Sequence, residues 1–489
     1  MSNSTKISRN TILTAIGIAI MLLFRYLPAP QGLVELDMQI AGIFIGTIFL
    51  WLFVSTSWPS IIVIAALIMT PLYTTAQGLA ASMGSWVTSF VLFSSMCTFA
   101  LTKTGFLRRC ALWFITRPIA KNKPWLMIAL FLLGTLFVGS FMSPLPTFII
   151  FAAIAEQIYL ELGYEKGDRF PQMLHLSILG IASLSTATTP IAHSVPILGF
   201  SLFEKDTGVP IDFTQFTIFG VAISIVIYFA FILVMKYVFK PDMERLKNID
   251  TDFLTKEMKP MSVEEKIPLI VFVAVVLLWM LPGIVRSAFP TNAWADYWNA
   301  LGAGIPPLLG AVALCLIKVK GKPIMGMEES VKAAPWVAVM MVAGTMLLGG
   351  ALTHNDIGLT KWLVASLEPV VKGLSPLTFV FIVSMLVVIV TNFASNTVTV
   401  TLVYSFMLPL VYSGVVTGVN PAALTSVIGA GACMALATPP ATGHAAVAVG
   451  TGWLKNEIMF KYGMSLALIQ GLVLAFIGYP IAAAIMPLI

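Results

Sequence analysis

The chain has 489 residues, of which 58% are hydrophobic and 10% are charged, and its mean hydropathy is +0.94. A soluble domain carries about a quarter charged residues, so this composition excludes a soluble globular protein. Apolar stretches recur that are long enough to cross a hydrocarbon core of about 30 Å, where every backbone polar group needs an internal partner. We therefore expect an all-α polytopic membrane protein in contact with the lipid bilayer. The net charge of +6 calls for no nucleic-acid partner, because the basic residues lie in short loops beside the apolar stretches.

The first half of the chain contains six predicted membrane spans. Between the fourth and the fifth lies an apolar stretch, 124–160, that is interrupted at 139–147 by the sequence GSFMSPLPT. Prolines and a glycine in such a short segment disfavour one continuous helix, so we predict a re-entrant hairpin that enters and leaves the membrane on the same side. The six spans are 11–29, 38–55, 58–75, 84–102, 171–203 and 213–239.

A charged segment, 236–266, divides the chain near its middle. It carries seven Lys or Arg and seven Asp or Glu residues, and its part 241–266 is a predicted cytoplasmic linker. A second interrupted apolar stretch, 375–413, follows and predicts a second re-entrant hairpin. The prediction for the whole chain is about 11 transmembrane helices plus two hairpins, with the later spans at 267–285, 298–318, 335–353, 421–454 and 462–488.

The positions of Lys and Arg predict the orientation, because cytoplasmic loops carry an excess of both. The N-terminal tail, the cluster at 108–123 and the linker all fall on one predicted side, whereas Lys361 and Lys372 are exceptions. We predict a multi-pass protein of the cell (inner) membrane with a cytoplasmic N-terminus and a C-terminus outside. The halves then form two inverted-topology repeats, and the predicted units are an N-terminal span and tail at 1–37, a first repeat at 38–240, the linker at 241–266 and a second repeat at 267–489.

Each predicted hairpin is followed by a long apolar segment that is broken around a threonine and a proline. The first break is at Thr188-Thr189-Pro190, and the second is at Thr438-Pro439-Pro440. Interruptions at corresponding positions of two inverted halves are typical of a transporter site at the middle of the membrane. Proline and glycine are also common in membrane helices generally, but four breaks in symmetric order favour the site.

The turn of the second hairpin carries a run of small polar residues, 391–397, between apolar flanks. Such side chains are costly in hydrocarbon unless they face a cavity, a partner or an ion. Hydroxyl and amide groups, together with free backbone N–H groups at a helix start, suit an oxyanion. Polar contacts between helices are the alternative. Because no charged residue lies near any of the four breaks, we expect a dianion that is bound through dipoles and accompanied by cations.

The chain resembles the divalent anion:sodium symporter (DASS) family. The resemblance rests on Ser395-Asn396-Thr397 followed by Ala437-Thr438-Pro439-Pro440, and it covers nearly the whole chain. It implies an inverted repeat with two re-entrant hairpins, a homodimer, and transport of dicarboxylates, citrate or sulfate. Similar segments are Leu101-Thr102-Lys103-Thr104-Gly105 before the first hairpin and Gly452-Trp453-Leu454-Lys455 after the second break.

The resemblance also implies roles for residues of the second half. Ser395, Asn396 and Thr397 would contact a substrate carboxylate, with Thr438 and Pro439 beside them. The residues implied as ligands of Na⁺ are Thr391, Ala394, Asn396 and Ala437.

The first half departs from the family pattern. Where a second Ser-Asn-Thr is usual, the chain has Pro144-Leu145-Pro146, with Ser143 and Thr147 on either side. The position of the usual Gly-Thr-Pro-Pro-Asn reads Ala187-Thr188-Thr189-Pro190-Ile191, which lacks the asparagine. Ser143, Thr147 and Thr188 remain candidate substrate ligands, whereas the Na⁺ positions at Ser140 and Ala187 lose a cation ligand.

Two of the four histidines follow the broken segments, His193 in the first half and His444 in the second. One interpretation is that each is bonded to a neighbouring helix. The other is that they bind the substrate carboxylate or couple its movement to protons, since imidazole titrates near neutral pH.

The sequence favours a cation-coupled symporter, with sodium as the expected cation, for a di- or tricarboxylate that works by alternating access. A sodium-independent dicarboxylate exchanger and a symporter of sulfate or another divalent oxyanion are the alternatives. The chain has no HExxH motif, paired intramembrane carboxylates or nucleophile–base arrangement, so we do not expect an enzyme. We expect the hairpins and broken helices to form a mobile domain, 38–75 and 267–318 a scaffold, and 105–119 and 355–372 interfacial connecting helices.

Overall fold

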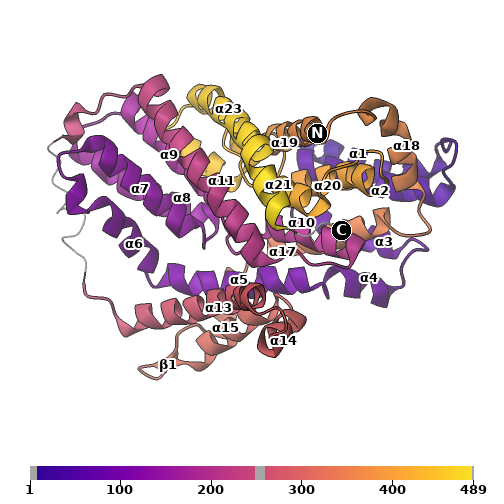
Figure 1. The fold of residues 1–489 in the computed structure, drawn as a ribbon, viewed down its shortest axis with the longest axis horizontal. Helices are drawn as coiled ribbons and strands as arrows, with labels where there is room; N and C mark the ends of the chain where they lie inside the picture. The colour runs from indigo at the N-terminus through magenta and orange to yellow at the C-terminus, as the bar shows by residue number, and fades with distance from the viewer. Residues whose placement is uncertain (1–7, 248–258, 487–489) are drawn as a thin grey trace, which may run out of the picture.

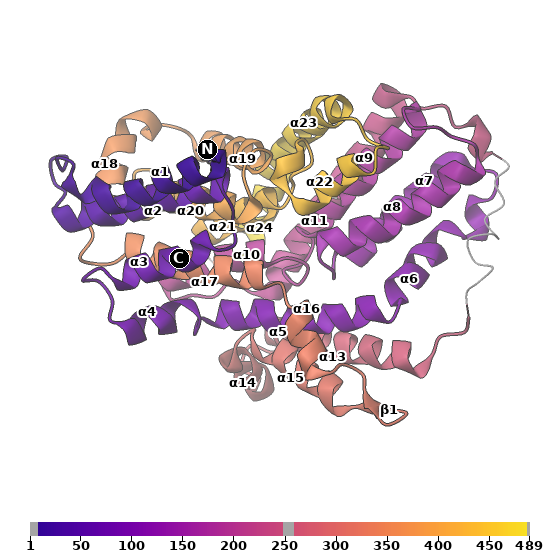
Figure 2. The same cartoon turned by 180° about the vertical axis from the view of Figure 1, so that it is seen from behind.

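The computed structural model describes residues 8–247 and 259–486, so the tail before residue 8 and the middle of the predicted linker lie outside the described residues. The chain folds into helices that run side by side along an elongated molecule (Figures 1 and 2). One small antiparallel hairpin is formed by β1 (Lys318–Val319) and β2 (Lys322–Pro323). The all-α prediction is confirmed in this coarse form.

Residues 8–247 contain both long helices and short helical turns. They are α1 (Arg9–Leu23), η1 (Phe24–Tyr26), α2 (Glu35–Phe53), α3 (Pro59–Ile68), α4 (Thr75–Ser82), α5 (Trp86–Lys103), α6 (Phe106–Ile115), η2 (Pro118–Ala120), α7 (Pro124–Gly139), α8 (Pro144–Glu161), α9 (Arg169–Ser185), α10 (Ser194–Thr207), α11 (Phe213–Leu233), η3 (Val234–Phe239) and η4 (Glu244–Leu246).

Residues 259–486 follow a similar order of elements. They are α13 (Val263–Ala288), α14 (Ala293–Leu301), α15 (Ile305–Leu316), α16 (Met327–Ala333), α17 (Trp336–Leu352), α18 (Leu359–Val371), α19 (Pro376–Thr391), α20 (Asn396–Tyr412), α21 (Pro421–Ala432), η5 (Pro439–Ala441), α22 (Gly443–Gly450), α23 (Asn456–Val473), η6 (Leu474–Gly478) and α24 (Tyr479–Ile485).

Both interrupted stretches form helical hairpins, α7 with α8 and α19 with α20, and each has a break of four residues. The first break is shorter than predicted, because Pro144 and Pro146 lie in the first turn of α8 and do not interrupt the helix. Proline is tolerated there, since the backbone N–H groups of a first helical turn need no partner inside the helix. The segment 139–147 therefore contains both the end of α7 at Gly139 and the start of α8 at Pro144.

Helix length alone does not give the number of membrane crossings. Among the described residues, five helices are long and apolar enough to cross a membrane, or up to nine if each bent pair is one span. The bend of 79° between α14 and α15 falls inside the predicted span 298–318. Helix α18 turns into α19 by 113°, at the boundary between the predicted connecting helix 355–372 and the predicted hairpin 375–413. The count of 11 spans and the inverted repeats therefore stay predictions.

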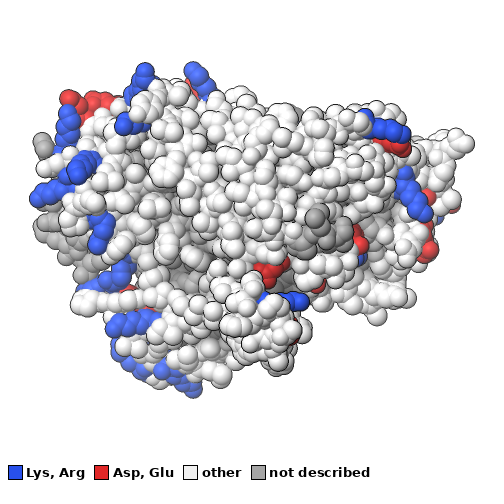
Figure 3. Space-filling model, viewed as in Figure 1, with Lys and Arg blue, Asp and Glu red and all other residues white. Residues whose placement is uncertain are grey.

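Buried apolar side chains form two clusters. The smaller cluster joins α2 and α3 to α17, whereas α13 and α15 pack with α5 in the larger one. The predicted scaffold segments 38–75 and 267–318 thus belong to different clusters. On one face of the molecule, a wide uncharged surface separates an end rich in Lys and Arg from a smaller group of charges at the other end (Figure 3). This distribution agrees with a multi-pass membrane protein.

Helices of the two halves pack against each other in a reciprocal way. Helix α10, which follows the first break, contacts the second hairpin arm α20 and the helix α21. Helix α22, which follows the second break, contacts the first hairpin arm α8 and the helix α9 (Figure 2). The four interrupted segments are therefore joined in one packed unit.

Candidate functional site

The second hairpin tip gathers oxygen atoms at the end of α19. The hydroxyl oxygen of Thr391 lies 2.9 Å from Oδ1 of Asn396 and 2.6 Å from the backbone carbonyl oxygen of Ala432. Thr391 is fully buried, and Asn396 is the first residue of α20. Three oxygens here share the single proton of one hydroxyl group, so unshared lone pairs converge. Such a surplus of acceptors suits a bound cation.

Asn392 holds this tip against the second broken segment. Its Oδ1 accepts hydrogen bonds from the backbone amides of Leu436 at 2.9 Å and Ala437 at 2.7 Å. Its Nδ2 donates to the carbonyl oxygen of Val388 at 2.6 Å. Because the two backbone donors require an oxygen opposite them, the orientation of the amide is determined. Asn392 is a positioning residue that the sequence analysis did not single out, although it lies within the polar run 391–397.

A matching contact ties each hairpin to the break that follows it. The hydroxyl of Thr438 donates to the backbone carbonyl of Asn392 in the second half. In the first half, the hydroxyl of Thr189 donates to the backbone carbonyl of Ser140. Asn392 and Ser140 are the residues that directly follow α19 and α7, so the two contacts occupy corresponding places in the fold. Thr189 was not among the predicted site residues.

The ends of the hairpin helices align the two halves differently from the sequence comparison. Ser143 directly precedes α8, and Ser395 directly precedes α20, so Pro144 holds the position in the first hairpin that Asn396 holds in the second. The position equivalent to the Ser-Asn-Thr tripeptide is therefore Ser143-Pro144-Leu145, one residue earlier than the sequence motif suggested. Proline has neither a backbone N–H nor a side-chain donor, so the first tip offers fewer donors to an anion.

Ser143 and His193 line one cavity of about 130 Å³ beside α5. His193 precedes α10, and its Nδ1 accepts a hydrogen bond from the backbone amide of Val195 at 3.2 Å. Helix α5 adds hydroxyl groups to this cavity that sequence reasoning missed. They belong to Ser94, Ser95 and Thr98.

His444 has a different environment from His193. Its Nε2 lies 2.8 Å from Oγ of Ser183 in α9, and Ser183 itself donates to the carbonyl oxygen of Ala435 at 2.7 Å. Because the hydroxyl has one proton, His444 is the donor in this contact and carries a proton on Nε2. The buried His444 thus links the second broken segment to the first half, whereas His193 bonds to the backbone two residues later.

Other predicted ligands of the first half bond mainly to neighbouring protein groups. Thr188 contacts the hydroxyl of Ser224 in α11 at 2.8 Å. The hydroxyls of Thr147 and Ser140 donate to carbonyls one helical turn earlier, those of Ser143 at 3.0 Å and Leu136 at 2.7 Å. Among the predicted site residues, hydrogen bonds join Thr391 to Asn396 in the second half and Thr147 to Ser143 in the first.

A sodium ion fits the neutral oxygens of the second tip. The described part of the chain has no group of three or more His, Cys, Asp or Glu side chains that could hold a metal ion, so carbonyl and hydroxyl oxygens are the available ligands. Thr391, Asn396 and the carbonyl of Ala432 supply three such oxygens. Hard cations prefer oxygen ligands of this kind.

Comparison with known proteins gives the family. The model of the sodium:sulfate symporter transmembrane region matches residues 6–486. The sodium-dependent dicarboxylate transporter SdcS of Staphylococcus saprophyticus is 26% identical over 462 residues, which are 90% of this chain and 86% of the relative. The protein of the same name from Staphylococcus aureus strain USA300 is 24% identical over 91% of this chain and 86% of its own length.

Two solved structures share the fold at low sequence identity. The YdaH transporter of Alcanivorax borkumensis has a TM-score of 0.51 at 13% identity and covers 90% of this chain and 97% of its own. MtrF of Neisseria gonorrhoeae, described as one of a class of antimetabolite efflux pumps, has a TM-score of 0.52 at 12% identity over 99% and 96% of the two chains. Both are transporters, and neither the family nor these relatives are enzymes. The chain belongs to the sodium:sulfate symporter family, the DASS family of membrane transporters.

Proposed function

We propose that this protein is a sodium-coupled symporter of a di- or tricarboxylate that works by alternating access. The observation that carries the proposal is the group of oxygens at the second hairpin tip, where Thr391 and Asn396 meet the carbonyl of Ala432. Relatives of similar length are named sodium-dependent dicarboxylate transporters, which supports both the ion and the substrate class.

The proposed binding step uses residues of this chain for both solutes. A sodium ion bound at the tip would supply a positive charge beside the substrate. Asn396 and Thr397 begin α20, whose first backbone N–H groups and positive dipole end favour a carboxylate. Thr438 and Pro439 border the same tip through the contact of Thr438 with Asn392. Cation and anion then stabilise each other, so each raises the affinity for the other.

Alternating access is supported by the reciprocal packing of the interrupted segments. Because α10 contacts α20 and α22 contacts α8, the hairpins and broken helices can move together as one unit. Within the proposal the protein lies in the cell (inner) membrane as a homodimer, with its N-terminus in the cytoplasm and its C-terminus outside. The two halves form inverted repeats in this arrangement.

Binding of Na⁺ and substrate to purified protein tests the proposal. We expect NaCl, but not choline chloride at equal ionic strength, to increase the affinity for succinate or citrate. We expect Asn396→Ala to abolish this coupling while leaving the protein folded. Equal affinity in both salts would contradict the symporter.

A sodium-independent dicarboxylate exchanger is the second candidate. It is favoured by Pro144, which holds the position equivalent to Asn396. The proline offers the first tip neither a backbone N–H nor a side-chain donor. Counterflow of labelled dicarboxylate in sodium-free vesicles would support exchange, whereas its absence would support symport. A sulfate symporter differs from both in its substrate and is distinguished by labelled sulfate uptake.

A further inference from the structure

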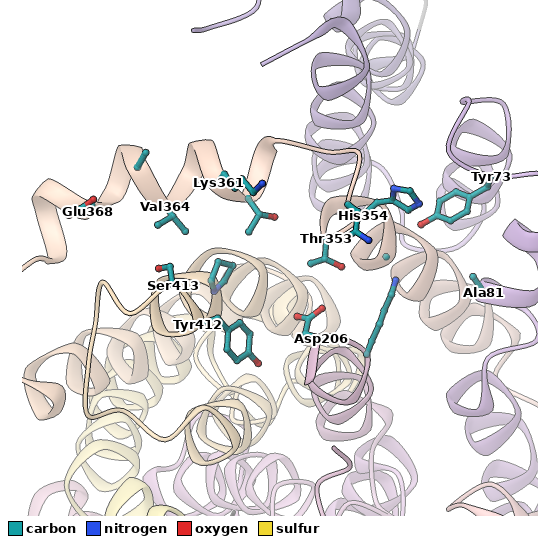
Figure 4. Close-up of a pocket in the computed structure, with 16 residues that line it drawn as sticks. Tyr73, Ala81, Asp206, Thr353, His354, Lys361, Val364, Glu368, Tyr412 and Ser413 are labelled. Atoms are coloured by element: carbon teal, nitrogen blue, oxygen red, sulfur yellow. The ribbon is translucent and has the colours of Figure 1, made fainter. Parts of the chain in front are cut away.

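A wide pocket with charged side chains lies away from the hairpin tips. It has a volume of about 890 Å³ and is lined by α17 and α18 on one side and by the ends of α10 and α20 on the other. In Figure 4, Lys361 on α18 faces Asp206 and Tyr412, and His354 and Tyr73 close one end. None of the predicted site residues lines this pocket.

Lys205 reaches across the pocket from the last turn of α10. Its ammonium group lies over Gly350 of α17, close enough that a Cβ atom at Gly350 would overlap it. The hydroxyl of Tyr73 would lie 3.2 Å from the same Cβ atom, so the ammonium and this hydroxyl approach one spot. Gly350 thus leaves room for a cation at the wall of the pocket.

The carboxylates of the pocket already have partners. Asp206 accepts a hydrogen bond from the hydroxyl of Tyr404 at 2.9 Å, and Glu368 pairs with Lys372 at 2.9 Å. Neither Lys205 nor Lys361 forms an ion pair with any carboxylate of residues 8–247 and 259–486. A tyrosine hydroxyl leaves the negative charge of Asp206 in place, so the lining offers the two ammonium groups against this one carboxylate, and the excess of positive charge favours an anion.

The remaining lining fits a small organic anion. Apolar walls from Val364 and Pro409 alternate with the hydroxyls of Tyr73 and Tyr412. Sites for small molecules are typically concave and mostly apolar, with a few placed polar groups. Lys205 on α10 and Lys361 on α18 belong to opposing elements, so each can meet a different carboxylate of a di- or tricarboxylate.

We propose that this pocket is a second binding site for a di- or tricarboxylate, held by Lys205 and Lys361. The substrate class rests on the proposed function, whereas the site itself rests on the unpaired lysines. The cations raise the local concentration of the anion beside the packed unit that carries the hairpins. This role also accounts for Lys361, whose position disagrees with the positive-inside pattern.

Calorimetric titration of the full-length protein in detergent with succinate and with citrate tests the second site. In sodium buffer of low ionic strength, we expect two classes of site in the wild-type protein. Lys205→Gln and Lys361→Gln remove the weaker class or weaken it by at least about tenfold, which is the effect of losing a charged hydrogen bond. Asn396→Ala removes the other class only.

Two further variants serve as controls. Lys332→Gln removes a charge of the same sign on α16, where neither Lys332 nor its partner Glu328 lines the pocket, and we expect both classes to remain. Lys361→Arg keeps the charge and restores the weaker class. Thermal unfolding of each variant confirms that it is folded.

One class of site in the wild-type protein would overturn the second site. So would unchanged binding in both lysine variants, or loss of all binding in Asn396→Ala. If sodium-dependent uptake is absent but lysine-dependent binding of citrate remains, the proposed function fails and the pocket site stands.

Discussion

The hydroxyl of Thr438 donates a hydrogen bond to the backbone carbonyl of Asn392, and this contact fastens the second hairpin tip to the second broken segment. Thr189 and Ser140 make the same contact in the first half. A helix that ends inside a membrane leaves backbone carbonyls without partners, and a nearby hydroxyl satisfies one of them. The two threonines therefore hold each break in a fixed position, and they explain why a threonine precedes a proline in both halves.

Asn392→Ala tests the positioning of the second broken segment. The change leaves the buried amides of Leu436 and Ala437 without an acceptor, and each unsatisfied group costs about 1–3 kcal/mol. We expect the free energy of unfolding to fall by about 2–5 kcal/mol, with loss of uptake. Thermal unfolding in detergent measures this. Phe393→Ala, at the neighbouring exposed position, is the control that we expect to unfold like wild type; equal unfolding of both variants would refute the role of Asn392.

Thr391→Val tests the cation site. The variant keeps the shape of the side chain but removes one of the converging oxygens, so the sodium concentration that gives half-maximal uptake rises by about tenfold. Uptake measured against external NaCl gives this value. Thr391→Ser keeps the hydroxyl and retains the wild-type sodium dependence. An unchanged sodium requirement in Thr391→Val would place the cation elsewhere.

Pro144→Asn restores a donor at the first hairpin tip. Pro144 holds the position equivalent to Asn396, and the substitution places both a backbone N–H and an amide side chain at the start of α8. We expect tighter substrate binding by about 2- to 10-fold, which corresponds to one added hydrogen bond. Pro144→Ala returns only the backbone N–H and separates the two contributions. If neither variant binds more tightly, the first tip does not contact the substrate.

Ser183→Ala tests whether His444 has a structural role. The hydroxyl of Ser183 accepts the Nε2 proton of His444, and removing it leaves that buried donor with Thr442 alone, at 3.5 Å. We expect the free energy of unfolding to fall by about 1–3 kcal/mol, without change in the pH profile of uptake. The control is Ser177→Ala, also in α9, whose hydroxyl bonds to the carbonyl of its own helix. A shifted pH profile in Ser183→Ala would support proton coupling through His444.

Local chemistry was sufficient to predict the hairpins. Glycine, proline and small polar residues limit where a helix can end and begin, so the breaks after Gly139 and Thr391 are readable from the sequence. The proline-rich start of α8 was misassigned to the break because proline is as suitable in a first turn as in a loop. The bend between α14 and α15 was missed, since it depends on packing against other helices.

The contacts within the site are less accessible to sequence reasoning. Asn392 bonds to residues more than forty positions later, and only the folded hairpin brings them together. Asp206 and Tyr404 are 198 residues apart, so nothing near either one marks the charged pocket. Only Lys361 was weakly indicated by the sequence, because its position disagrees with the positive-inside distribution of Lys and Arg. The predicted roles of the tip residues remain predictions until binding is measured.

Uptake into proteoliposomes tests the central claim most directly. Purified protein is reconstituted, and entry of labelled succinate, malate, citrate and sulfate is followed with an inward sodium gradient and with sodium equal on both sides. We predict concentrative uptake of a di- or tricarboxylate only when the gradient is present. Uptake of the same size without a sodium gradient, or accumulation of none of these carboxylates, would contradict a sodium-coupled carboxylate symporter.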